Sequence, residues 1–147
     1  MVREDIDTIY IGRFQSRNFI NPEIMVGARL PLFATAGGLA LLAQLNQDEV
    51  DEVFARSTFE KITSFTEIDP AKIRERLELV RERGYAVAHQ ETSIGDISVA
   101  AAIVDGDRSP IAALSISASA MTISIADAER QFAPLVMAAA SSLSNRR

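Results

Sequence analysis

Polar side chains recur at alternate positions along two apolar segments in the C-terminal half of the chain. The segment DISVAAAIV (96–104) carries Asp96 and Ser98, and PIAALSISA (110–118) carries Ser115 and Ser117. Alternate side chains of a β-strand point to the same face. Hydroxyl groups both donate and accept hydrogen bonds, and the alanines between them leave space. If the two segments pair, these residues would form the floor of a binding site for a small polar molecule.

The remaining positions of both segments carry mainly larger aliphatic side chains. They are Ile97, Val99 and Ile103 in the first segment and Ala112, Leu114 and Ile116 in the second. The turn sequence DGDRS between the segments predicts an antiparallel hairpin. A shift of one residue in the pairing would mix large side chains with serines on both faces, so the pattern fixes the register. The alternative to a binding floor is that the serine face meets solvent.

The stretch FATAGGLALLAQL (33–45) predicts a helix from about Thr35 to Leu45. Its adjacent glycines, Gly37 and Gly38, each cost about 1 kcal/mol relative to alanine inside a helix. Either the free N–H groups at the helix N-terminus contact a ligand, or the glycines let the helix pack closely on a sheet. The stretch lacks the lysine and the spacing of a phosphate-binding loop. The sequence therefore leaves both roles open.

The only histidine, His89, lies in the predicted strand GYAVAHQE (84–91). A serine hydrolase would need it beside Ser98 or Ser115, but no nucleophile-elbow pattern surrounds either serine. A hydrogen-bonded structural histidine is the alternative. The chain contains no cysteine, which excludes thiol catalysis and zinc–thiolate sites, and one histidine does not make a histidine-rich metal site. We expect no metal and no cofactor.

The composition is that of a globular protein that folds as one domain. The 147 residues are 48% hydrophobic and 24% charged, with a net charge of −5. Phosphate binding needs clustered Lys and Arg, so this chain by itself is not expected to bind DNA. No apolar run reaches the roughly 18 residues of a membrane span, and the acidic start MVREDIDT is unlike a signal peptide. These features predict a cytoplasmic protein without a membrane partner.

The other segments predict strands and helices in an order typical of an α+β domain. Strands are expected at 7–14 and 23–30, and helices at 48–55, at 69–84 and from 124 onward. In the helix DPAKIRERLELVRERG, Asp69 is the expected N-cap, Pro70 the first helical residue and Gly84 the residue just past the end. Ile73, Leu77 and Val80 form its apolar stripe, and its alternating Arg and Glu residues predict a solvated face.

Three blocks in this order, RLPLFATAGGLALLA, DPAKIRERLELVRERGYAVAHQE and GDISVAAAIVDGDRSPIAALSIS, resemble the effector-binding domain of IclR-type transcriptional regulators. The resemblance runs from about Asp7 to the C-terminus. It implies a GAF-like fold, with a curved antiparallel sheet flanked by helices, and a cup that binds a small metabolite. The cup positions that it implies are Thr35, Ala36 and Gly37, then Asp96 and Ser98, and then Ser115 and Ser117.

The resemblance also implies a function. Regulators of this family sense small-molecule effectors, often carboxylates or aromatic acids, as homodimers or homotetramers, and they bind DNA through a winged helix-turn-helix. That DNA-binding domain is absent from this sequence, so residues 1–147 are predicted to form a single effector-binding domain without enzyme activity. Phe54, Phe59 and Phe65 lie in a segment with no single apolar stripe, which favours self-association.

The chain departs from the family's pattern at several cup positions. Ala88 and His89 stand where acidic residues are common, Asp96 where the residue is usually apolar, and Phe33 where histidine is common. An acid at position 96 would favour a ligand with hydroxyl or amine donors over a bare anion. His89 is included among the candidate ligand-binding residues. Two other functions stay open: a small hydrolase that uses His89 with a serine, and a purely structural dimerisation module.

Overall fold

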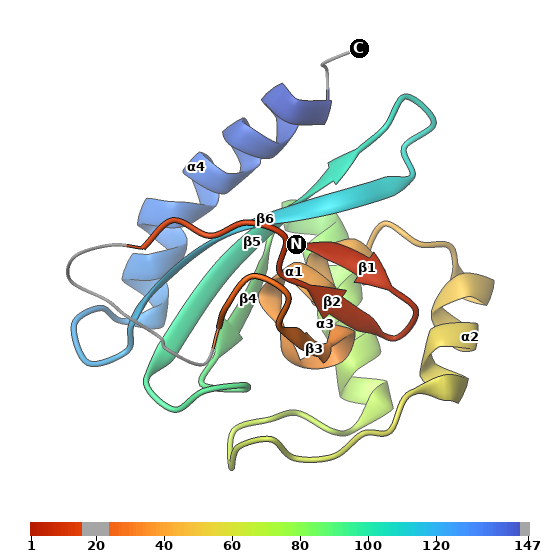
Figure 1. Ribbon diagram of the computed structural model, residues 1–147, viewed down its shortest axis with the longest axis horizontal. Helices are drawn as coiled ribbons and strands as arrows, with labels where there is room; N and C mark the ends of the chain where they lie inside the picture. Colours follow the sequence, from red (N-terminus) through yellow and green to blue (C-terminus); the bar gives the residue numbers. More distant parts are fainter. Residues whose placement is uncertain (16–23, 145–147) are drawn as a thin grey trace.

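The computed structural model describes residues 1–15 and 24–144 (Figure 1). Within them the chain forms two three-stranded antiparallel sheets and four α-helices, the α+β class that the sequence predicts. The strands are β1 (Val2–Glu4), β2 (Asp7–Ile9), β3 (Arg29–Pro31), β4 (Ala86–His89), β5 (Asp96–Val104) and β6 (Pro110–Ser119). The helices are α1 (Ala36–Leu42), α2 (Gln47–Arg56), α3 (Pro70–Arg83) and α4 (Ile125–Ser144), and a 3₁₀ turn, η1 (Leu32–Ala34), precedes α1.

The larger sheet has the strand order β4-β5-β6 and contains the predicted hairpin. Strands β5 and β6 pair with Ser98 opposite Ser117 and Ala100 opposite Ser115. This pairing confirms the register that the alternation of large and small side chains predicts. The three strands bring the serines and the large aliphatic side chains to opposite faces of one sheet.

Helices cover both faces of this sheet (Figure 1). α4 packs on the face that carries Ile97, Val99 and Ile103. α1 packs on the opposite face, where Ala100 and Ala113 are at most 3% exposed. The serine face is therefore not a simple solvated face, because α1 covers the alanines that lie between the polar residues.

The smaller sheet, β1-β2-β3, is joined to the edge strand β6 of the larger one. The backbone N–H of Ala113 donates to the Met1 carbonyl oxygen over 2.8 Å. The strands predicted at 7–14 and 23–30 are much shorter in the structure, and residue 23 lies outside the described residues. The second predicted strand is interrupted by a tight turn at 25–28, closed by a 2.9 Å hydrogen bond from Ala28 N to Met25 O, in which Gly27 has a φ of +91°.

The long charged helix α3 has the predicted ends. The Asp69 carboxylate accepts a hydrogen bond from the backbone N–H of Ala71 over 2.9 Å, and Gly84 closes the helix with a φ of +84°. Its stripe of Ile73, Leu77 and Val80 is buried, as predicted. Among the described helices, none is both long enough and apolar enough to cross a membrane.

The two glycines of α1 have different surroundings. A methyl group on Gly38 would overlap the main-chain carbonyl of Leu32 in the preceding turn. A methyl group on Gly37 would instead meet the flexible end of the Met1 side chain. Close packing of backbone against backbone therefore explains Gly38, whereas Gly37 faces a side chain that can move.

We expect Gly38→Ala to destabilise the protein by about 2 kcal/mol, because the Leu32 backbone must shift to admit the methyl group. Gly37→Ala is the matched control, in which higher helix propensity offsets the displacement of Met1. Urea unfolding of both variants measures the difference. Equal stability of the two variants would contradict this account of Gly38.

Candidate functional site

Two adjoining hollows lie beside the larger sheet. One lies at the start of α1, and the other lies between residues 10–15 and β6, where most of the lining side chains are apolar. The smaller is a cavity of about 10 Å³, roughly the space of one water molecule. The larger is a groove of about 540 Å³ along β6, a volume suited to a small metabolite. Among the described residues, both hollows are lined by Met1, Tyr10, Asp96 and Ser115. The two hollows thus share one wall, and we treat them as one candidate site.

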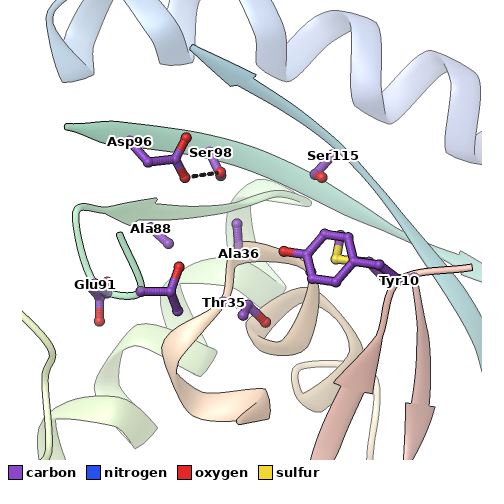
Figure 2. Close-up of a pocket in the computed structure, with 11 residues that line it drawn as sticks. Tyr10, Thr35, Ala36, Ala88, Glu91, Asp96, Ser98 and Ser115 are labelled. Carbon is purple, nitrogen blue, oxygen red and sulfur yellow. Dashed lines mark hydrogen bonds between the residues drawn. The ribbon is translucent and has the colours of Figure 1, made fainter. Parts of the chain in front are cut away.

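Seven of the eight predicted site residues line these two hollows, and Figure 2 labels Thr35, Ala36, Asp96, Ser98 and Ser115 among them. The smaller cavity is lined by Thr35, Ala36, Gly37, Asp96, Ser98 and Ser115, and Ser117 lines the groove. They come from two elements far apart in the sequence, the start of α1 and the β5–β6 hairpin. Strand alternation and the glycine pair therefore located the hairpin side and the α1 side of the site, but not the part that the N-terminal segment supplies.

His89 lies on the other face of the sheet. It pairs with Ile97 across β4 and β5, so its side chain shares the face covered by α4. Its ring centroid lies 5.8 Å from that of Phe65, and Gln90 Nε2 lies 3.2 Å from His89 Nε2. The sheet separates the imidazole from Ser98 and Ser115, so the arrangement that a His89–serine hydrolase needs is not formed.

The hydroxyl group of Thr35 is committed to starting α1. Its Oγ1 accepts a hydrogen bond from Gly38 N over 2.9 Å and lies 3.3 Å from Thr8 Oγ1. Thr8 uses its own proton on Leu30 O, 3.0 Å away, so Thr35 must donate to Thr8. Thr35 therefore lines the cavity but has no hydroxyl proton left for a ligand.

Asp96 is a buried acid of the site. It is 6% exposed, and its Oδ2 accepts a hydrogen bond from Ser98 Oγ over 2.8 Å. Burial raises the pKa of Asp96, while the Ser98 hydrogen bond and the nearby positive charge of Arg13 oppose this rise. Burial and the negative charge of Asp96 raise the pKa of Tyr10 to about 12. Tyr10 is therefore a neutral phenol that can donate a hydrogen bond into the site.

A buried ion pair at the edge of the cavity was not predicted from the sequence. Glu91, 6% exposed, accepts hydrogen bonds from Arg76 at 2.7 Å and 3.0 Å, and Arg76 also donates to Val87 O at 3.0 Å. The pair ties the turn after β4 to α3. Arg76 was assigned to a solvated face because it belongs to a run of alternating charges. Its spacing of three residues from Ile73 and four from Val80 places it on the apolar stripe, and this was the available signal.

The first ten residues supply a second feature that the sequence reading missed. Tyr10 reaches into the site from the segment after β2 (Figure 2). It was assigned to a longer strand, and strand alternation alone says nothing about contacts with a distant hairpin. The structure adds Tyr10 because the small sheet is attached to β6 through Met1 and Ala113.

A sheet covered by helices on both faces, with a polar hollow beside a buried helix, defines an α+β domain with a candidate small-molecule site. Residues 1–145 match the family described as the bacterial transcriptional regulator IclR C-terminal domain. The transcriptional repressor IclR of Escherichia coli K12 is 32% identical over 138 residues, which cover 94% of this chain and 50% of that protein. The chain belongs to the IclR C-terminal family.

Solved structures agree with this assignment. The IclR protein of Thermotoga maritima superposes with a TM-score of 0.91 at 26% identity, covering 97% of this chain and 57% of that one. The PobR inducer-binding domain from Acinetobacter, a double mutant in complex with 3-hydroxybenzoic acid, has a TM-score of 0.84 at 25% identity and covers 98% and 85%. The chain spans about half the length of the curated relatives it matches.

The buried pair predicts a large and rescuable loss of stability. Arg76→Met leaves the Glu91 carboxylate buried without its cation and is expected to cost roughly 3 kcal/mol. The double variant Arg76→Met, Glu91→Leu should recover most of that loss. Lys72→Met, at an exposed position on the same helix, is the control. A single variant as stable as the control in urea unfolding would show that the pair does not hold the turn.

The raised pKa of Asp96 predicts a particular pH dependence. The folded state holds this proton more tightly than the unfolded state, so ionisation of Asp96 costs stability. The cost is fully present above the folded pKa and vanishes below the unfolded value of about 3.9. Asp96→Asn should therefore gain stability over the wild type at neutral pH and lose this advantage towards about pH 4. Unfolding free energies at several pH values test this, and an advantage that grows on acidification would contradict it.

Proposed function

We propose that this chain is the effector-sensing domain of a bacterial transcriptional regulator and that it binds a small molecule between α1 and the β5–β6 hairpin. The observation that carries the proposal is the convergence of seven small or hydroxyl- and carboxylate-bearing residues on two adjoining hollows. The PobR domain, whose structure contains 3-hydroxybenzoic acid, shares this fold. DNA binding would belong to a separate domain of the regulator, since this chain carries a net charge of −5.

The position of the site suggests how a ligand would act. Its walls come from the N-terminal segment, which supplies Tyr10, from α1 and from the larger sheet. A ligand held by both Tyr10 and the hairpin would favour the arrangement in which the two sheets are drawn together. A ligand shifts such an equilibrium only by its difference in affinity for the two arrangements. The small sheet would then be the element that transmits binding.

The proposal includes a homodimer or homotetramer in the cytoplasm. The structure changes the basis for self-association, because Phe59 packs within the molecule against Phe33 and Phe54, at ring-centroid distances of 4.9 Å and 5.3 Å. Phe65 is 50% exposed and remains available. A purely structural dimerisation module is the competing function. It differs from the sensor by showing no saturable binding of small molecules.

A thermal-shift and calorimetry screen tests the proposal. The probes are 3-hydroxybenzoate, lactate, glycerate and gluconate, each with its counterpart lacking hydroxyl groups. A specific ligand at 100 times its dissociation constant should stabilise the fold by about 2.7 kcal/mol.

Ser115→Leu should abolish this stabilisation while the fold is kept, because Ser115 borders both hollows. Ser141→Leu, at an exposed position of α4, is the matched control and should bind like the wild type. The absence of saturable binding across the panel, or equal binding by the two variants, would refute the proposed site.

A further inference from the structure

One oxygen of Asp96 is buried without a partner. Among the described residues, Oδ1 of Asp96 receives no hydrogen bond, although the residue is 6% exposed and lines both hollows. A buried carboxylate oxygen that lacks a donor destabilises a fold. This oxygen has almost no accessible surface, so a ligand in the adjoining hollow would supply the missing donor once the neighbouring side chains move aside.

The hydroxyl groups of Ser98 and Ser117 do not supply it, because each donates its proton elsewhere. Ser98 Oγ donates its only proton to Asp96 Oδ2 over 2.8 Å, as Figure 2 shows. Ser117 Oγ lies 2.6 Å from Ser98 Oγ and must therefore be the donor of that bond. The side chain of Ser117, which is exposed and lines the groove, keeps only its lone pairs for a ligand. Both ends of this chain of hydrogen bonds thus present acceptors.

The charges around the hollow favour a neutral donor over a cationic one. The second acid of the cavity, Glu91, is already paired with Arg76. Arg13, which lines the groove and donates to Ile24 O, lies near enough for its positive charge to lower the pKa of Asp96. The positive charge of Arg13 offsets part of the attraction that Asp96 exerts on a ligand ammonium group, whereas it leaves a hydroxyl donor almost unaffected.

We infer that the pocket binds a small polyhydroxylated molecule, in which one hydroxyl group donates to Asp96 Oδ1 and another to Ser117 Oγ. This inference rests on the proposed function and specifies its ligand class. The groove of about 540 Å³ has room for several hydroxylated carbons. Hydroxyl groups remain able to accept from Tyr10 while they donate to Asp96. Asp96 is therefore the specificity-determining residue of the site.

The first test needs no ligand. Asp96→Leu removes the unpaired carboxylate and should raise the melting temperature by about 3 °C. Asp107→Leu, at an exposed position in the β5–β6 turn, is the control and should leave it unchanged. A melting temperature that falls in Asp96→Leu would show that Asp96 is kept for the stability of the fold, and it would overturn the inference whatever the ligand.

The second test compares probes that share a carbon skeleton. Calorimetry with glycerate, 3-hydroxypropionate, 3-aminopropionate and propionate should show affinity that increases with the number of hydroxyl groups, and glycerate should bind Asp96→Asn at least tenfold more weakly than the wild type. Asp107→Asn should bind like the wild type.

The outcomes separate the two proposals. If propionate binds as tightly as glycerate, or 3-aminopropionate binds best, the pocket is a ligand site of another class and this inference fails while the proposed function stands. If neither these four probes nor the panel of the screen binds saturably, the proposed function itself fails.

Discussion

Complete burial of α1 is the constraint on which the rest of the structure depends. All seven residues of this helix are buried, between the larger sheet, α3 and the turn that precedes it. A buried helix must satisfy its terminal backbone groups without solvent. Thr35 satisfies the N-terminal end, and Arg81 reaches from α3 to donate to the carbonyl oxygens of Ala43 and Leu45 at 2.8 Å and 3.3 Å. The sequence can bury this helix only because both ends have a side-chain partner.

The same constraint produces the hollow. The helix approaches the sheet closely because Ala86, Ala100 and Ala113 lie beneath it. Towards the start of α1 these alanines give way to Asp96, Ser98 and Ser115, whose polar side chains cannot pack against an apolar helix. The helix begins there, and its first turn lines the space that remains. The position of the site thus follows from where the small apolar residues of the hairpin end.

Local rules were sufficient for the features that depend on one element or on one pair of strands. The ends of α3 and the register of the hairpin follow from capping residues and from the alternation of side chains, and the structure confirms both. The short strands β2 and β3 do not follow from propensity, because the turn at Gly27 interrupts an otherwise strand-like run. The side chain of His89 lies on the face of the sheet opposite the hollow. Its pairing with Ile97 determines this face, and the sequence of β4 alone does not predict that pairing. The pairing of Arg76 with Glu91 joins two elements. It was not predicted from the sequence because Arg76 belongs to a run of alternating charges, which is typical of a solvated face.

A comparison of the two buried acids of the hollow shows that the fold does not require an acid to be left without a partner. Glu91 and Asp96 lie five positions apart and are both 6% exposed. The fold supplies Glu91 with a bidentate arginine and a backbone N–H from Glu67. At Asp96 it supplies one hydroxyl group to one oxygen and, among the described residues, leaves the other oxygen buried without a donor. An apolar side chain at position 96 would carry no electrostatic cost, since the neighbouring positions on the same face of β5 are Ser98, Ala100 and Ala102. The fold pairs Glu91 but leaves one oxygen of Asp96 without a donor. In the inference above, a ligand supplies that donor.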